Sequence, residues 1–182
     1  MKKLLFIPAL LFIAILFISC GGDKKPGDLP VQVKAAAEKT FPALVATEGV
    51  AQSVEVEFRV EDFPGVVQYK KWIKNADVPM STTSTYIELK GISEEDQVEL
   101  KNVTVSLASV PANQFSFRIT TITNNEKFAA DRTDRVTFMQ AVMNEVVSKG
   151  SSKIVLKYTP GTTMVNPNVK MTIRIDAEFF FN

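Results

Sequence analysis

Hydrophobic and polar residues alternate with a period of two along much of this chain. In residues 54–61, VEVEFRVE, every even position is apolar and every odd position is charged. The C-terminal segment 169–181 alternates over a longer stretch, and its apolar positions are Val169, Met171, Ile173, Ile175, Ala177, Phe179 and Phe181. Because successive side chains of a strand point to opposite faces, both segments are predicted to be strands with one buried and one solvated face.

Five other segments are rich in Val, Ile, Thr, Phe or Tyr, are bounded by turn residues, and are predicted strands. They are residues 66–73, 84–90, 97–110, 114–123 and 153–159. Within 97–110 the apolar positions change from even to odd numbers, which predicts a bulge or tight turn near Lys101 and Asn102. Residues 35–47 fit either a short helix or an edge strand.

One segment has helical spacing. Between residues 134 and 149 the apolar residues recur at intervals of three and four: Val136, Met139, Val142, Met143, Val146 and Val147. Asp134 is the predicted N-cap, and Gly150 is the predicted stop signal. The pattern therefore predicts a helix that covers a sheet.

About eight alternating strands and one helix predict a mainly β fold, an antiparallel β-sandwich with one covering helix. The expected strand arrangement is immunoglobulin-like, although the Cys…Trp…Cys pattern of antibody domains is absent. A small β-barrel is the alternative, because Phe180 projects from the polar face of the last strand and would suit the lining of a cavity.

The N-terminus has a different pattern. A basic head, MKK, precedes residues 4–18, which contain no charged or polar side chain. These are the two regions of a secretory signal, and the run is shorter than the roughly 20 residues that span a bilayer. The sequence FISC, residues 17–20, resembles the lipobox of bacterial lipoproteins, although Phe17 replaces the leucine that is common there. The alternative is an ordinary signal peptide that is cut nearby and leaves a free thiol.

The resemblance implies that residues 1–19 are a signal peptide and that Cys20 receives a diacylglycerol and holds the protein on a membrane. Residues 20–30 then form a lipidated cysteine with a flexible tether, and 31–182 form a single domain. Gly21 stands where some lipoproteins carry the aspartate that retains them on the inner membrane, so we expect the outer membrane of a cell envelope. The mature chain has 19 basic and 20 acidic residues, which predicts no attraction to nucleic acid.

The composition excludes several chemistries. The chain has no histidine and only one cysteine, so Ser-His-Asp and Cys-His catalysis and the usual zinc, copper and haem sites are excluded. No glycine-rich phosphate-binding motif is present. Glu55, Glu57 and Glu61 remain as candidates for glycoside hydrolysis, but they are expected to form an exposed row. Residues 93–96 and 131–135 offer oxygen atoms for calcium, but they fit helix caps better. We predict no cofactor and no metal.

The segment around the only tryptophan is the candidate for a partner or ligand surface. Tyr69, Lys70, Lys71 and Trp72 combine aromatic and cationic side chains that bind sugars or protein partners, and Phe180 joins them as an outward aromatic residue. If residues 66–73 are a strand, Tyr69 and Trp72 lie on opposite faces, and Trp72 is expected in the core.

Three function classes remain open. The first is a non-enzymatic envelope lipoprotein that binds a protein partner as an accessory or assembly module. The second is a carrier of an apolar ligand, with the helix at 134–149 as a lid. The third is a carbohydrate-active hydrolase that uses only carboxylates.

Overall fold

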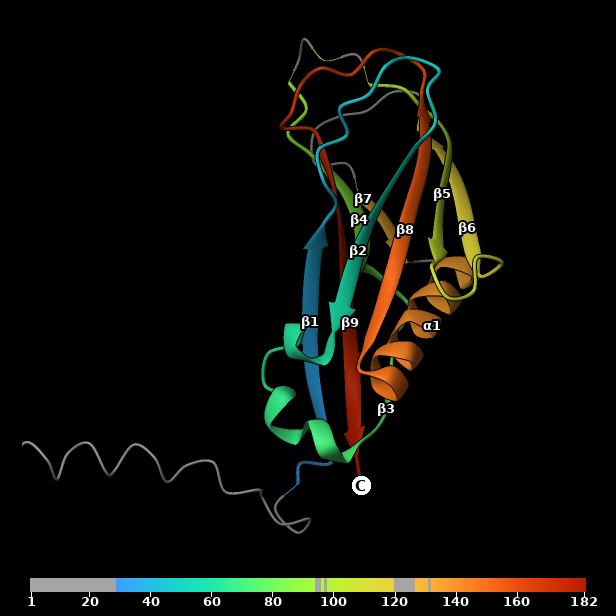
Figure 1. Cartoon of the computed structure of the whole chain (residues 1–182). Helices are drawn as coiled ribbons and strands as arrows, with labels where there is room; N and C mark the ends of the chain where they lie inside the picture. Colours follow the sequence, from blue (N-terminus) through green and yellow to red (C-terminus); the bar gives the residue numbers. More distant parts are fainter. Residues whose placement is uncertain (1–28, 94–95, 97, 120–126, 131) are drawn as a thin grey trace, which may run out of the picture.

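The computed structural model describes residues 29–182 except 94–95, 97, 120–126 and 131. The chain is an antiparallel β-sandwich with one covering helix, as the alternation predicts (Figure 1). The described strands form two separate sheets, and not the small barrel that was the alternative. The predicted signal peptide and Cys20 lie outside the described residues. Within the described ranges, no helix has the length and hydrophobicity needed to cross a bilayer.

Within the described part of the chain, nine strands make up the two sheets. The first sheet has the order β1-β9-β4-β7, with β3 also paired to β9, and the second has the order β2-β8-β5-β6. The strands are β1 (Gln32–Thr40), β2 (Gln52–Arg59), β3 (Ile73–Asp77), β4 (Ser81–Lys90), β5 (Leu100–Leu107), β6 (Gln114–Ile119), β7 (Lys127–Ala130), β8 (Ser151–Pro160) and β9 (Lys170–Phe181).

The strand pairing is nested. β1 pairs with β9, β2 with β8, β4 with β7, and β5 with β6, each antiparallel. The chain therefore resembles one long hairpin, with its tip between β5 and β6, folded into two layers, which is the jelly-roll form of sandwich. The expected immunoglobulin-like order is not the one found. Alternation determines which side chains are buried, but it does not determine which strand lies beside which.

Residues 66–73 are a correction to the sequence prediction. They were expected to form a strand, but Val67–Trp72 form a 3₁₀-helix, η3, which follows a shorter one, η2 (Val60–Asp62). The buried residues here are three apart: Val60, Phe63, Val66 and Tyr69. A 3₁₀-helix has three residues per turn, so this spacing places all of them against the core. The short strand β3 follows η3 directly, and it was missed in the sequence, as was β7.

The bulge predicted near Lys101 and Asn102 is present. The pairing of β5 with β6 shifts register between Leu100 and Val103. Its pairing with β8 shifts register between Lys101 and Thr104. Asn102 has a φ of 51°, in the left-handed region that asparagine tolerates better than most residues. The shift returns the apolar side chains of β5 to the core.

Helix α1 (Thr133–Lys149) covers the side of the sandwich between β8 and β3. Its N-cap is Arg132, so the prediction of Asp134 as the cap was wrong; Asp134 lies in the first turn. The side chain of Gln140 accepts a hydrogen bond from the Val78 amide at 2.8 Å and donates one to the Ala76 carbonyl at 2.7 Å. The helix thereby satisfies backbone groups at the edge of β3, which protects that edge from pairing with another chain.

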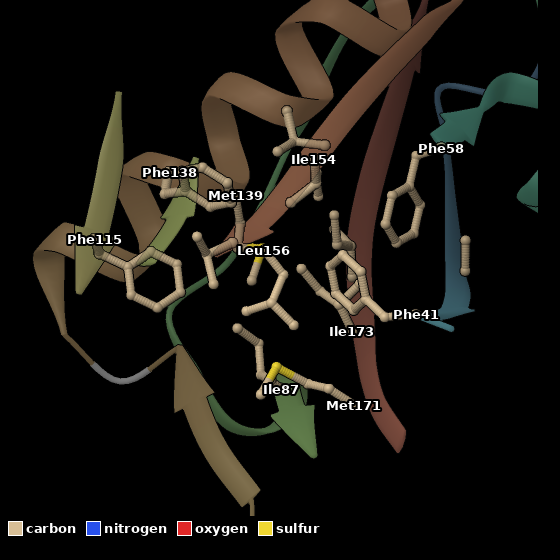
Figure 2. Close-up of a cluster of buried hydrophobic side chains, with 14 of the residues drawn as sticks. Phe41, Phe58, Ile87, Phe115, Phe138, Met139, Ile154, Leu156, Met171 and Ile173 are labelled. Carbon is tan, nitrogen blue, oxygen red and sulfur yellow. The ribbon is translucent and has the colours of Figure 1, made fainter. Parts of the chain in front are cut away.

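The space between the sheets is filled by large side chains from both layers and the helix (Figure 2). Phe63 and Phe179 contact edge to face with ring centroids 5.1 Å apart, and Phe115 and Phe138 do so at 5.2 Å. Residues with less than 2% exposure include Phe41, Phe58, Phe63, Phe138 and Phe179. The core is therefore closely packed aromatic and aliphatic material.

Glu145 is a charged group held where α1 meets β8. Its carboxylate accepts hydrogen bonds from Ser109, from Ser152 at 2.8 Å and from Lys149 at 2.6 Å. Burial opposes the ionisation of Glu145, but the hydrogen bonds from Lys149, Ser109 and Ser152 outweigh it and lower the pKa below its ordinary value of 4.5. Ionised Glu145 therefore stabilises the fold.

We expect Glu145→Gln to lower the free energy of unfolding at pH 7 by about 2 kcal/mol, because charge-assisted hydrogen bonds are lost. A group with a lowered folded pKa contributes stability above its unfolded pKa and loses it as pH falls through the folded value. The difference between the variant and the natural protein should therefore shrink below pH 4.5. Urea unfolding of both proteins at several pH values measures this difference in the free energy of unfolding. The exposed Glu55→Gln is the control, and an equal loss there would contradict the assignment.

Candidate functional site

The sandwich has two ends of different character (Figure 1). At one end, called the distal end, the loops 41–51 and 161–169 lie together with the described residues of the loop before β5, which are 91–93, 96 and 98–99. At the other, called the η3 end, the start of β1, the two 3₁₀-helices and the end of β9 lie together. The described chain enters at Leu29, at the η3 end.

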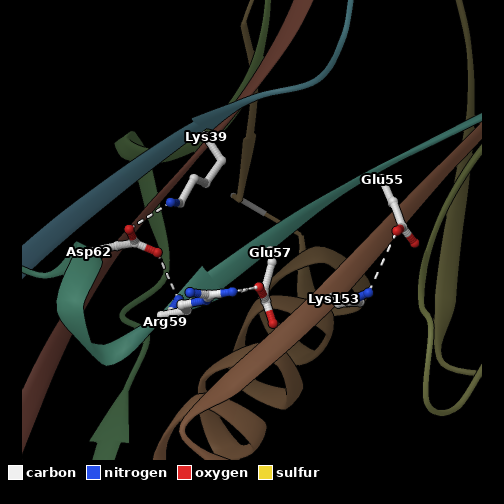
Figure 3. Close-up of polar contacts among 6 residues, drawn as sticks. All are labelled: Lys39, Glu55, Glu57, Arg59, Asp62 and Lys153. Carbon is white, nitrogen blue, oxygen red and sulfur yellow. Dashed lines mark hydrogen bonds and ion pairs between the residues drawn. The ribbon is translucent and has the colours of Figure 1, made fainter.

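The three candidate carboxylates are engaged in separate surface ion pairs, and Figure 3 shows those of Glu55 and Glu57. Glu55 lies 3.6 Å from Lys153, Glu57 accepts hydrogen bonds from Arg59, and Glu61, which lies in η2 and not in a strand, pairs with Lys70. Arg59 and then Ser151 lower the pKa of Glu57 by hydrogen bonding, and Lys70 does the same to Glu61. A general acid needs a raised pKa, so the environments of Glu57 and Glu61 favour the ionised carboxylate over that role.

The described carboxylates of the two acidic segments that were candidates for calcium make local contacts, and the N-terminus of α1 has no side-chain cap. Oδ2 of Asp96 accepts hydrogen bonds from the Ser93 amide at 2.7 Å, the Ser93 hydroxyl at 2.9 Å and Nδ2 of Asn166 at 2.7 Å. The Ser93 amide, Asn166 and the Ser93 hydroxyl, in that order, lower the pKa of Asp96. Asp134 pairs with Arg132 at 3.3 Å. Glu94, Glu95 and Asp131 lie outside the described residues. Among the residues that are described, no three His, Cys, Asp or Glu side chains form a group that could hold a metal ion.

The candidate aromatic and cationic residues gather at the η3 end, with two changes from expectation. Tyr69, not Trp72, is the buried aromatic residue, and its ring lies edge to face with Phe181 at 5.3 Å. Trp72 is only partly buried. Lys70 and Lys71 are exposed, with Lys70 paired to Glu61, and Phe180 is partly exposed on the outer face of β9. The structure therefore leaves Lys70, Lys71, Trp72 and Phe180 accessible at one end.

The distal end carries an apolar tip that sequence reasoning missed. Ala46 and Met164 form an isolated antiparallel bridge, with N–O distances of 3.0 and 2.8 Å. Both are buried, whereas the residues next to them in sequence, Val45 and Val165, are exposed. Val45 is 48% exposed and Val165 is 75% exposed. The two residues lie far apart in sequence, and only the fold brings them together.

A pocket of about 230 Å³ opens next to this tip. It is lined by Asp96, Val98, Thr162, Thr163, Met164, Val165, Asn166 and Val169. Its volume lies below the roughly 300–1,000 Å³ of typical small-molecule sites. The side-chain amide of Asn166 is engaged by Asp96, the Gly91 carbonyl and the Asn168 amide, so much of the polar lining already serves the loops.

Hydrogen bonds from backbone amides hold the distal loops together. Leu44 donates to the Val169 carbonyl at 2.9 Å, and the Glu48 amide donates to the Thr163 hydroxyl at 3.3 Å. Gly161 donates to the Glu99 carbonyl at 2.7 Å, which joins the loop before β5 to the loop before β9. The exposed valines are therefore presented on an ordered support, and binding there would order few additional residues.

No protein-family model matches the chain, and no curated protein matches it. Among solved structures, it is similar to that of Desmodium yellow mottle tymovirus, with 10% identity and a TM-score of 0.38 over 100% of this chain and 92% of that chain. The decameric BFDV capsid protein (9% identity, TM-score 0.42, 81% and 97% coverage) and turnip yellow mosaic virus (9%, 0.37, 84% and 94%) are also similar. At these scores the similarities give no information about function.

Proposed function

We propose that this protein is an envelope lipoprotein, anchored through Cys20, that binds a protein partner and catalyses no reaction. The observation that carries the proposal is the separation of the two ends. The chain from Cys20 enters the sandwich at the η3 end, while the ordered distal loops expose Val45 and Val165. This arrangement suits a domain that is fixed at one end and presents the other to a partner.

Two observations favour a protein over a small ligand or a substrate. The pocket beside Val165 is smaller than typical small-molecule sites, which favours a partner that contacts the exposed surface around it over an enclosed ligand. The candidate carboxylates pair with cations, which suits a solvated surface better than acid–base chemistry. The outer membrane remains the proposed location, and no role with nucleic acid is proposed.

Native mass spectrometry of the full-length protein, gently extracted from the membranes of its own host, tests this proposal. We expect a stoichiometric protein mass to remain bound to the natural chain. Val165→Asp should reduce the bound fraction at least about tenfold, since a buried unpaired charge at an interface costs well above 1.4 kcal/mol.

Val110→Asp is the matched control, because Val110 is also an exposed loop valine, 50% accessible, but lies in the turn between β5 and β6. It should leave the complex intact. A small apolar mass retained in place of a protein would favour the carrier function. Equal loss in both variants would show that the tip is not the contact.

A further inference from the structure

The start of β1 and the end of η3 lie on opposite sides of the last residues of β9. Gln32 is opposite Phe180 in the β1–β9 pair, and Ile73 is opposite Phe181 in the β3–β9 pair. Strands are about 4.8 Å apart, so Gln32 and Ile73 are separated by roughly 10 Å. The Asn182 amide also donates to the Trp72 carbonyl at 3.0 Å. The chain that comes from Cys20 thus enters next to Trp72.

The surface around this entry point has the composition of a membrane interface. Val31, immediately before β1, is 83% exposed, and Val67 at the start of η3 is also exposed. Trp72 is partly exposed beside three lysines: Lys70, Lys71 and Lys74. Tryptophan settles at the level of lipid head groups, and lysine extends its charge into water while its stem covers apolar surface. We call Val31, Val67, Lys70, Lys71, Trp72 and Lys74 the basal surface.

We propose that the basal surface lies on the lipid bilayer, with Trp72 and Val67 in the head-group region. This inference rests on the proposed anchoring through Cys20. Nine residue steps separate Cys20 from Leu29, and even a fully extended chain of that length reaches only about 32 Å. β9 has 12 residues, so at about 3.4 Å per residue the distal end lies roughly 40 Å away. The anchored chain can bring the basal surface to the bilayer, but it is too short for the sandwich to stand inverted on its distal loops.

The charges indicate how the basal surface binds. Residues 60–74 contain three lysines and two carboxylates, and one lysine, Lys70, pairs with Glu61. The segment therefore has only one net positive charge, so attraction to anionic lipids is a minor part of the contact. Because of the anchor, the effective concentration of the basal surface at the bilayer is about millimolar. At that concentration, even a weak apolar contact between the basal surface and the lipids is populated. Docking should therefore occur on zwitterionic bilayers also.

The fluorescence of Trp72 tests this directly, because it is the only tryptophan in the chain. The full-length lipidated protein is reconstituted into phosphatidylcholine vesicles, with or without lipids brominated on their acyl chains. We expect bromination to reduce the emission to about half, since an interfacial indole lies close to the upper acyl chain. Adding anionic lipid should change this little. Emission that is unaffected by bromination and is quenched by aqueous acrylamide would overturn the inference.

A second reporter provides the control. In the variant Trp72→Phe/Val165→Trp, the only tryptophan lies at the distal tip, and brominated lipid should not quench it. Vesicle flotation and the intact mass of the same sample report on the anchor independently. Protein that carries no lipid or fails to float would contradict the proposed function. Protein that floats but leaves Trp72 unquenched would contradict the basal surface alone, as would a co-purified protein that is released by Lys70→Glu/Lys71→Glu.

Discussion

Replacing Cys20 with serine is expected to abolish anchoring. The variant has no thiol to receive the diacylglycerol, so its mature form should leave the detergent phase for the aqueous phase in a detergent phase-partition experiment. A single acyl chain gives only marginal membrane binding, whereas two chains hold a protein stably. For the form without residues 1–19, the expected change is therefore nearly complete. Intact mass spectrometry should show either a chain without lipid or a precursor that keeps residues 1–19.

Ser19→Ala is the matched control, because alanine keeps a small residue before the cysteine. It should be processed, lipidated and partitioned like the natural protein. A Cys20→Ser variant of mature mass that still partitions into detergent would contradict lipidation. It would also remove the geometric basis for placing the η3 end at the bilayer. Without a lipid on Cys20, the length of the chain before Leu29 no longer limits how the sandwich is oriented to the bilayer.

The sequence predicts the layers of this fold better than its connections. The long alternating segments that became β2 and β9 show clearly which face is buried, and the phase change at Lys101 reveals the bulge. These features depend on side chains close together along the chain. The nested order of the strands depends on pairings such as Gln32 with Phe180, which local patterns do not encode. For that reason, the sandwich was predictable and the jelly-roll order was not.

The η3 segment shows how a pattern is misinterpreted. Val66, Tyr69 and Trp72 are apolar or aromatic residues at intervals of three, which is the period of a 3₁₀-helix. The preceding Pro64 and Gly65 form a turn, with Gly65 at a φ of 81°. Propensity for β structure favours Val, Tyr and Trp, and it suggested a strand here. Attention to the period of three would have placed Val66 and Tyr69 against the core, although the same period includes Trp72, which the structure leaves partly exposed at the end of η3.

The candidate surfaces were predictable to different degrees. The cluster at Lys70, Lys71 and Trp72 is contiguous in sequence, so composition alone identified it. The distal tip is assembled from Val45 and Val165, which the Ala46–Met164 bridge brings together. Single exposed valines are common on protein surfaces, and Val165 is distinctive because it also lines a pocket. A discontinuous site of this kind requires the fold before it can be recognised.

Gly91→Ala should be strongly destabilising, by about 3 kcal/mol or more, for two independent reasons. Gly91 has a φ of 79°, a conformation that costs other residues about 1–2 kcal/mol. A Cβ there would also lie 1.9 Å from the backbone oxygen of Asn168, an impossible contact with atoms that belong to the distal loops. The Gly91 carbonyl accepts a hydrogen bond from Asn166 at 3.1 Å, so movement of either strand end breaks this connection as well.

Gly49→Ala separates the two contributions. Gly49 has a similar φ of 73°, but a Cβ there has no atom within 4 Å, so only the backbone cost of about 1 kcal/mol should remain. Urea unfolding of both variants measures the difference. Because Val165 and Asn166 belong to the loop that contacts Gly91, Gly91→Ala should also weaken partner binding at the distal tip, while Gly49→Ala should not. Equal destabilisation would mean that the loop at Asn168 moves aside without cost, and the distal support would then be less rigid than its hydrogen bonds indicate.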